Sequence, residues 1–206
     1  MLRFLKKELH IISDIIFDEN DFIETSEEIY PYVTGIHLRV KAWSAHKLFQ
    51  TIERLKDAGV PGEKIYVNDR VDVAIASKAN GVQLSYRSLP VKEVKEHFPN
   101  IRIGKSIHTL DEAKQAETDG ADYIMFGNVF ETNSKPGQPA QGIERLKKIK
   151  EASSIPIISI GGITTENVQE VLPYTDGIAV LSAMWQAVDR PGIIKEFYEL
   201  LNPDKA

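Results

Sequence analysis

Short apolar runs rich in Val, Ile and Leu recur along the chain, separated by longer stretches with helical spacing. They predict eight strands, at residues 9–13, 35–40, 64–68, 81–84, 101–106, 122–127, 155–162 and 176–182. Between the second and third runs, Leu48, Ile52 and Leu55 fall on one helical face. Ser44 and Gly59 suit the start and the end of that helix. The pattern therefore predicts a strand followed by a helix, repeated eight times.

Alternating strands and helices favour parallel pairing, because each helix carries the chain back across the sheet. Eight such units predict an α/β fold, a single compact (β/α)8 TIM barrel, with an open doubly wound sheet as the alternative. The chain has 206 residues, and no Pro/Gly/Ser-rich linker or charge block divides it. We therefore expect one barrel domain over residues 1–206.

Composition narrows the functional classes. The chain has no cysteine, which excludes disulfides and Cys-ligated metals and fits a reducing, cytoplasmic location. Its net charge is −5 with both signs intermixed, which argues against a nucleic-acid partner. The opening MLRFLKKELH is too charged for a signal peptide, and no apolar run predicts a membrane span. We expect small-molecule ligands.

In (β/α)8 barrels, chemistry takes place at the carboxyl ends of the strands. Side-chain alternation places His37, Arg39 and Lys41 on one face of the second predicted strand. The same alternation places Asn128 on the face of Phe126 in the sixth. Polar residues at these strand ends are therefore the candidates for the site.

A candidate phosphate site follows the last two strands. Gly161 and Gly162 end the seventh strand, and Thr164 is expected to cap a helix that runs toward residue 172. Two glycines let a ligand approach the backbone, and a helix start favours an anion. Leu181 and Ser182 would add backbone N–H groups from the loop after the eighth strand.

Read in order, these segments resemble the thiamin phosphate synthase/TenI family over essentially the whole chain. The segments that carry the resemblance are LHIISD, HLRVK, VNDRVDVA, GVQLSYRSLP, GKSIHTLDEA, ADYIMFGNVFETNSK, IPIISIGGITTENV and DGIAVLSAM. The best-known member joins a pyrimidine diphosphate to a thiazole phosphate. The resemblance implies that the thiazole phosphate lies at Gly161, Gly162, Leu181 and Ser182.

For a synthase, the resemblance further implies residues around the pyrimidine and its diphosphate: Arg39, Lys41, Asn68, Ser106, Thr132 and Lys135. It also implies a magnesium ion held by two aspartates. Asp69 matches one of them, but Ser88 stands where the second belongs, with Arg87 beside it. Because a diphosphate leaving group needs its charge neutralised, synthase activity is the less favoured reading. We accordingly expect no metal and no cofactor.

The TenI branch resembles the chain more closely, through IHLR, VQL and FETNSK. This branch implies a thiazole tautomerase, an isomerase that converts the dihydro tautomer of carboxythiazole phosphate to its aromatic isomer. Its motif GHVFET reads GNVFET here, so Asn128 replaces the histidine that would move the proton. Lys41 is the first alternative proton carrier, with His37, His108 and Glu131 as fallbacks.

Three interpretations stay open for the tautomerase branch. A rerouted proton carrier would retain the isomerase, with Asn128 orienting the substrate. Binding of the tautomer by Arg39 and Lys41 alone would give a weak enzyme. A barrel that binds thiazole phosphate without converting it would be a sensor or regulatory protein. The sequence leaves open whether the chain forms a homo-oligomer.

Overall fold

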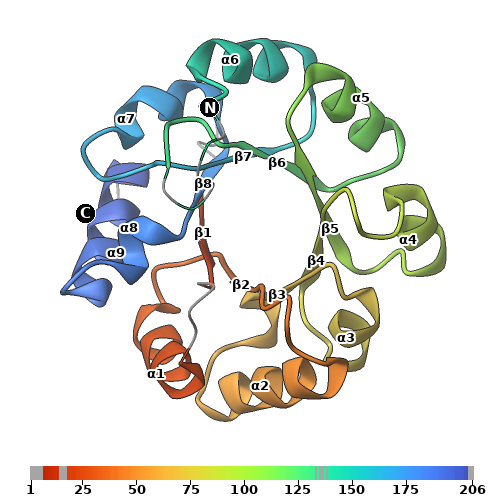
Figure 1. The fold of residues 1–206 in the computed structure, drawn as a ribbon, viewed down its shortest axis with the longest axis vertical. Helices are drawn as coiled ribbons and strands as arrows, with labels where there is room; N and C mark the ends of the chain where they lie inside the picture. Colours follow the sequence, from red (N-terminus) through yellow and green to blue (C-terminus); the bar gives the residue numbers. More distant parts are fainter. Residues whose placement is uncertain (1–6, 14–17, 133, 135–136, 138, 204–206) are drawn as a thin grey trace.

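The eight-unit pattern forms a closed barrel. The computed structural model describes residues 7–13, 18–132, 134, 137 and 139–203. Within these residues, eight parallel strands are hydrogen-bonded in chain order from β1 to β8, and β8 pairs with β1 to close the sheet. The helices lie outside the barrel (Figure 1). The predicted (β/α)8 barrel is thereby confirmed, and the open sheet is excluded.

The strands are short and lie where the apolar runs predicted them. They are β1 (Glu8–Ile12), β2 (Gly35–Leu38), β3 (Ile65–Asn68), β4 (Gly81–Leu84), β5 (Arg102–Ile107), β6 (Tyr123–Gly127), β7 (Ile157–Ile160) and β8 (Gly177–Val180). The second strand ends earlier than expected, so Arg39 and Lys41 lie in the loop after it. Strand alternation therefore does not fix the direction of these two side chains.

Helices return the chain from the carboxyl end of each strand to the start of the next. They are α1 (Glu19–Ile29), α2 (Ala45–Asp57), α3 (Val71–Ala76), α4 (Val91–His97), α5 (Leu110–Thr118), α6 (Ile143–Ala152), α7 (Val168–Val171), α8 (Ser182–Trp185) and α9 (Arg190–Leu201), with 3-10 turns at Gly62–Lys64 and Leu172–Tyr174. As predicted, Ser44 caps α2, accepting a hydrogen bond from the backbone of Lys47. None of the helices in these described ranges combines the length and apolar character needed to cross a bilayer.

Apolar side chains pack in two layers, one on each side of the sheet. The larger layer fills the space between strands and helices and includes Ile124 and Phe126 of β6. The smaller one lies inside the barrel and includes Tyr123 and Met125 of the same strand. Asn128 therefore does not reach the barrel mouth by sharing a face with Phe126. It does so because the chain leaves the strand at Gly127.

The amino-terminal end of the barrel interior is polar. Arg102, the first residue of β5, donates to both carboxylate oxygens of Glu8 in β1, at 2.6 and 2.8 Å. His10 is fully buried, and its Nε2 lies 2.9 Å from the Glu8 carboxylate. Burial alone would raise the pKa of Glu8, but the hydrogen bonds from His10 and Arg102 lower it from 4.5 to about 2. Glu8 is therefore a carboxylate whose charge is neutralised inside the barrel.

This ion pair predicts a steep loss of stability in acid. A pKa lowered in the folded state stabilises the fold above the unfolded value of 4.5, and the gain is lost as pH falls toward 2. Because one unit of pKa corresponds to about 1.4 kcal/mol, Glu8 accounts for about 3 kcal/mol of this loss. Urea unfolding of the natural protein and of Glu8→Gln, at pH 7, 5, 3 and 2, measures it. Equal pH dependence in the two proteins would refute the assignment.

Candidate functional site

A cavity of about 800 Å³ opens at the carboxyl ends of the strands. Residues that follow β2, β3, β4, β6, β7 and β8 line it, together with side chains of β5. This is the end at which (β/α)8 barrels carry their ligands. Its volume falls within the range of small-molecule sites.

The cavity brings together nearly all of the residues selected from the sequence. Its lining includes Arg39, Lys41, Asn68, Ser106, Asn128, Thr132, Gly161, Gly162, Leu181 and Ser182. Lys135 lies outside the described residues. His108 lines the cavity, whereas His37 is fully buried away from it and Glu131 is exposed outside its lining. The grouping follows from the topology, because parallel strands bring their carboxyl ends to one mouth.

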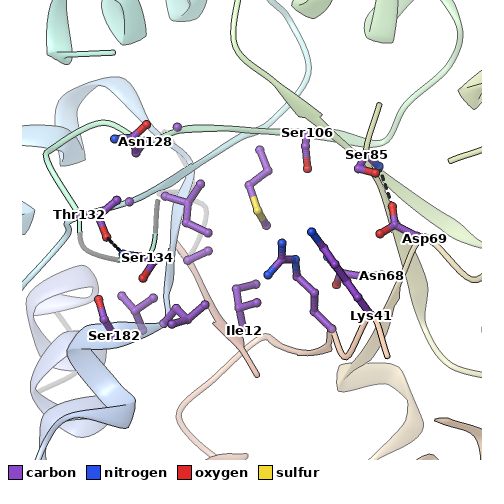
Figure 2. A pocket seen from close by; sticks show the side chains of 18 of the residues that line it. Ile12, Lys41, Asn68, Asp69, Ser85, Ser106, Asn128, Thr132, Ser134 and Ser182 are labelled. Carbon is purple, nitrogen blue, oxygen red and sulfur yellow. Dashed lines mark hydrogen bonds between the residues drawn. The ribbon is translucent and has the colours of Figure 1, made fainter. Parts of the chain in front are cut away.

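The lining has two unlike sides. Asn128, Thr132, Ser134 and Ser182 lie on one side, and Lys41, Asn68, Asp69, Ser85 and Ser106 on the other (Figure 2). The first side comes from the segments after β6 and β8, the second from β3 and β5 and the loops after β2, β3 and β4. Ile12 of β1 lies between the two sides (Figure 2), and Met125 of β6 adds to the apolar lining. The cavity can therefore hold polar groups at two separate points, with an apolar surface between them.

The loop after β7 differs from the expected glycine-to-helix turn. The helix begins at Val168 rather than near Thr164, so the predicted helix start beside the glycines is wrong. Asn167 explains the delay, because its Oδ1 accepts from the Thr164 backbone and its Nδ2 donates to the Gly162 carbonyl. This side-chain turn takes the place of the first helical turn.

Two features require a glycine at position 161: its positive φ angle and the close approach of the loop that contains Asn128. Its φ is +99°, and a Cβ there would lie 2.4 Å from the Cβ of Asn128. We expect Gly161→Ala to cost about 3 kcal/mol of unfolding free energy, from strain and steric overlap together. Gly59→Ala is the control, because Gly59 has a φ of +90° but open space around it, and should cost about 1 kcal/mol. Equal losses in chemical denaturation would contradict the contact.

Asp69 begins the loop after β3 and is fixed by the loop after β4. Its Oδ1 accepts from the Ser85 backbone at 3.2 Å and from the Ser88 hydroxyl at 2.5 Å. Burial would raise the pKa of Asp69, but the hydrogen bonds from Ser85 and Ser88 outweigh it and lower that pKa. Ser88 therefore acts as a hydrogen-bond donor that holds an ionised aspartate at the cavity wall.

These residues do not build the two-aspartate magnesium site that the resemblance implied. Ser88 offers a hydroxyl where the second carboxylate would stand, and it donates to Asp69. Across the described ranges, no three His, Asp or Glu side chains are arranged to hold a metal ion. The donor set at this wall is thus one carboxylate and hydroxyl groups, which is poorer than the carboxylate pair.

Restoring the carboxylate should create a metal response. We expect Ser88→Asp to raise the melting temperature of the protein in Mg²⁺ by more than Mg²⁺ raises that of the natural chain. At a magnesium concentration of about 100 times Kd, binding adds about 2.7 kcal/mol to the free energy of unfolding. Adding Asp69→Asn to the variant should remove the response, because only one acid then remains. Equal Mg²⁺ responses in the natural chain and Ser88→Asp would show that position 88 does not limit metal binding.

Lys105 also lines the cavity, although no sequence pattern indicated this residue. Lys105 lies on β5, and its Nζ donates to the Ser85 carbonyl at 2.8 Å. Burial lowers the pKa of its ammonium group, and the charges of Glu112 and Asp69 partly oppose this. Neighbouring residues of a strand point to opposite faces, so Lys105 starts on the face opposite Ser106. Its side chain comes to the cavity mouth because it is long.

Asn128 is an amide held in place. It is 3% exposed, and its Nδ2 donates to the Phe130 carbonyl at 3.2 Å. The adjacent residues Val129 and Phe130 continue the pairing beside β7 through hydrogen bonds to Ile160 and Gly161. A side-chain amide is neither protonated nor ionised at neutral pH, so it does not act as a general acid or base. Asn128 therefore shapes the cavity wall and offers polar atoms to a ligand.

Comparison with known proteins places this barrel in a family. A family model described as thiamine monophosphate synthase matches residues 9–184. Thiamine-phosphate synthases of Pyrococcus abyssi and Pyrococcus furiosus are 39% and 41% identical over 170 and 158 residues, covering 82% and 76% of each chain. The solved thiamine phosphate pyrophosphorylase from Pyrococcus furiosus superposes with a TM-score of 0.83 at 34% identity, covering 97% of both chains.

These comparisons correct the function expected from the sequence. The thiazole tautomerase reading is wrong, because relatives at 33–41% identity over most of the chain carry the name thiamine-phosphate synthase. The tautomerase was favoured because Ser88 replaces the second aspartate of a synthase and because IHLR, VQL and FETNSK resemble the TenI branch. These few positions weigh less than the similarity of the whole chain. The matched family model spans the barrel from β1 to α8. The chain belongs to the thiamin phosphate synthase/TenI family.

Proposed function

We propose that this protein joins a pyrimidine diphosphate to a thiazole phosphate, forming thiamin phosphate and releasing diphosphate. The observation that carries the proposal is the 38–41% identity to proteins named thiamine-phosphate synthase over three quarters or more of the chain. The cavity supports it, because the side chains that the resemblance assigns to the two substrates face one space.

The two sides of the cavity suit two phosphorylated substrates. The loops after β7 and β8 would take the thiazole phosphate through Gly161, Gly162 and Ser182. On the other side, Arg39 and Lys41 after β2 would take the diphosphate. In the closed strand order only β1 separates β8 from β2. At the cavity, however, Lys41 lies on the side opposite Ser182 (Figure 2). Each anion therefore has its own binding region, and the two rings meet between them.

The chemical step is a substitution at the methylene carbon of the pyrimidine. The carbon–oxygen bond breaks, and the diphosphate leaves with the bonding electron pair. The thiazole nitrogen supplies its lone pair to the same carbon, which forms the new carbon–nitrogen bond. Arg39 and Lys41 would stabilise the negative charge that grows on the departing oxygen. The apolar wall of Ile12 and Met125 would align the rings and exclude water.

This reaction also accounts for the amide at position 128. The condensation exchanges one bond for another at carbon and moves no proton between carbon atoms. A histidine at this position is therefore unnecessary, and an amide that shapes the wall suffices. The hydrogen bond from Asn128 to Phe130 fits such a shaping role.

Incubation of the protein with the pyrimidine diphosphate and the thiazole phosphate tests the proposal directly. Thiamin phosphate and free diphosphate are expected in equal amounts, as measured by chromatography and a diphosphate assay. Omitting the thiazole phosphate should stop diphosphate release, which separates condensation from hydrolysis. Binding of both substrates without product would overturn the activity and indicate a barrel that only binds them.

A further inference from the structure

A continuous line of polar side chains runs through the barrel interior toward the floor of the cavity. It begins at the Glu8 carboxylate, whose Oε2 lies 2.9 Å from the Nε2 of His10. The Nδ1 of His10 lies 2.7 Å from the Nε2 of His37. Asn68, the last residue of β3, stands two residues beyond Tyr66, the strand partner of His37, and lines the cavity. Both imidazoles are fully buried.

Charge in this line is already balanced without a proton on either histidine. Arg102 neutralises Glu8 through two hydrogen bonds, and its Nη1 also donates to the Tyr66 hydroxyl at 2.8 Å. Burial lowers the pKa of His10, and burial together with the charge of His10 lowers that of His37. Both imidazoles are therefore neutral at physiological pH, and each carries one N–H.

The carboxylate fixes which nitrogen of each imidazole carries that proton. Glu8 can only accept, so the Nε2 of His10 donates to it and the Nδ1 of His10 becomes an acceptor. The Nε2 of His37 must then donate to this nitrogen. As a result, the Nδ1 of His37 has no proton and is an acceptor as well. The ring of His37 is held in plane by stacking on Tyr66, with centroids 4.7 Å apart at an angle of 10°.

Asn68 is the next group in the line. The Nδ1 of His37 and the Oδ1 of Asn68 are both buried and lack a well-formed hydrogen bond. The parallel register pairs His37 with Tyr66, and Asn68 follows Tyr66 by two residues on the same face of β3, so the two unpaired atoms come from neighbouring strands. Two acceptors cannot bond to each other. Rotating the Asn68 amide by half a turn exchanges oxygen for nitrogen and lets its NH₂ group donate to His37.

We propose that Glu8, His10 and His37 together fix the Asn68 amide with its NH₂ group on His37 and its carbonyl oxygen toward the cavity. Asn68 then accepts a hydrogen bond from an amino group on the ligand ring. This inference rests on the proposed function, which places a pyrimidine ring in this cavity, and the acceptor oxygen of Asn68 selects a ring that carries an amino group. His37 is a positioning residue, because it acts on the ligand only through Asn68.

The arrangement predicts how the site chooses between similar rings. A ring that carries an amino group can donate to the Asn68 oxygen, whereas an analogue with a carbonyl group there brings two acceptors together. Such a mismatch leaves a polar group unpaired and rejects the analogue strongly. We expect the natural protein to bind the 4-aminopyrimidine diphosphate at least about tenfold more tightly than the 4-oxo analogue.

The first test is the protonation of the histidines, which needs neither ligand nor turnover. Nitrogen-15 NMR at neutral pH should show His10 and His37 as neutral rings with the proton on Nε2. Their signals are assigned by their loss in His10→Gln and His37→Gln, out of the five histidines of the chain. A proton on the Nδ1 of His37 would overturn the proposal, because Asn68 would then have to accept from it.

The second test measures the ring preference by calorimetry, with the pyrimidine diphosphates alone and no thiazole phosphate. His37→Leu should reduce the preference for the amino ring to below about threefold, and His37→Gln, which can both donate and accept, should restore part of it. Tyr123→Phe is the matched control, since its buried hydroxyl has no hydrogen-bond partner in the described structure and lies outside the cavity lining. A folded His37→Leu variant that keeps the full preference would refute the proposal.

The tests separate failure of this inference from failure of the proposed function. If the protein prefers the amino ring and shows the expected histidine protonation but forms no thiamin phosphate, the inference about Asn68 holds and the proposed synthase activity is wrong. If the protein condenses the substrates but does not prefer the amino ring, the synthase activity holds and the inference about Asn68 is wrong.

Discussion

Arg102→Met is expected to lower the free energy of unfolding by about 3–5 kcal/mol, the largest stability effect that we predict. The substitution leaves the Glu8 carboxylate, whose side chain is 20% exposed, without its bidentate partner. It also removes the donor to the Tyr66 hydroxyl. Urea denaturation at pH 7 measures the loss.

A surface arginine provides the comparison for this variant. Arg54 pairs with Glu19 at 2.8 Å, but its side chain is 47% exposed, so Arg54→Met should cost about 1 kcal/mol or less. The double variant Glu8→Gln/Arg102→Met should regain part of the stability, because no unpaired charge remains inside the barrel. If Arg102→Met and Arg54→Met lost similar amounts of unfolding free energy, the ion pair inside the barrel would contribute no more to stability than a surface ion pair.

Lys41→Ala is expected to reduce the kcat/KM for thiamin phosphate formation about 100-fold, the largest effect on activity that we predict. Lys41 is exposed at the mouth and lines the cavity, so its removal should leave the stability nearly unchanged. The loss follows from the missing positive charge beside the departing diphosphate. Steady-state kinetics with the pyrimidine diphosphate varied gives the value.

Lys148→Ala serves as the control for Lys41, because it removes the same side chain from an exposed position on α6 outside the cavity. Its kinetics should match those of the natural protein. If Lys41→Ala retained full activity, the cationic side of the cavity would have to be reassigned to Arg39 or Lys105.

The fold could be predicted from the sequence because its signals are local. Each strand is a short apolar run, and each helix has its own apolar face and, as at Ser44, its own cap. The predicted ends of the strands were less accurate than their predicted positions along the chain. The seventh strand was expected over 155–162 but covers Ile157–Ile160, because the positive φ angles of Gly161 and Gly162 end the extended conformation.

The site was predictable where position along the strand decides it, and not where distant side chains meet. Arg39 was selected because it lies at the end of a predicted strand, whereas Asn68 and Ser106 were selected through the resemblance, and all three line the cavity. The contact between Glu8 and Arg102 joins positions 94 residues apart, so no local sequence pattern predicts it. Nor could the sequence show that Ser88 bonds to Asp69, because that contact depends on how two loops fold against each other.

The pairing of β1 with β8 has a consequence for synthesis of the chain. β1 leaves the ribosome long before its partner Gly177–Val180 emerges. Until then the nascent sheet has two open edges, and open edges can pair with other chains. The Glu8 carboxylate can meet Arg102 only once β5 has emerged. We therefore expect aggregation during translation to be most sensitive to delays between the fifth and eighth strands.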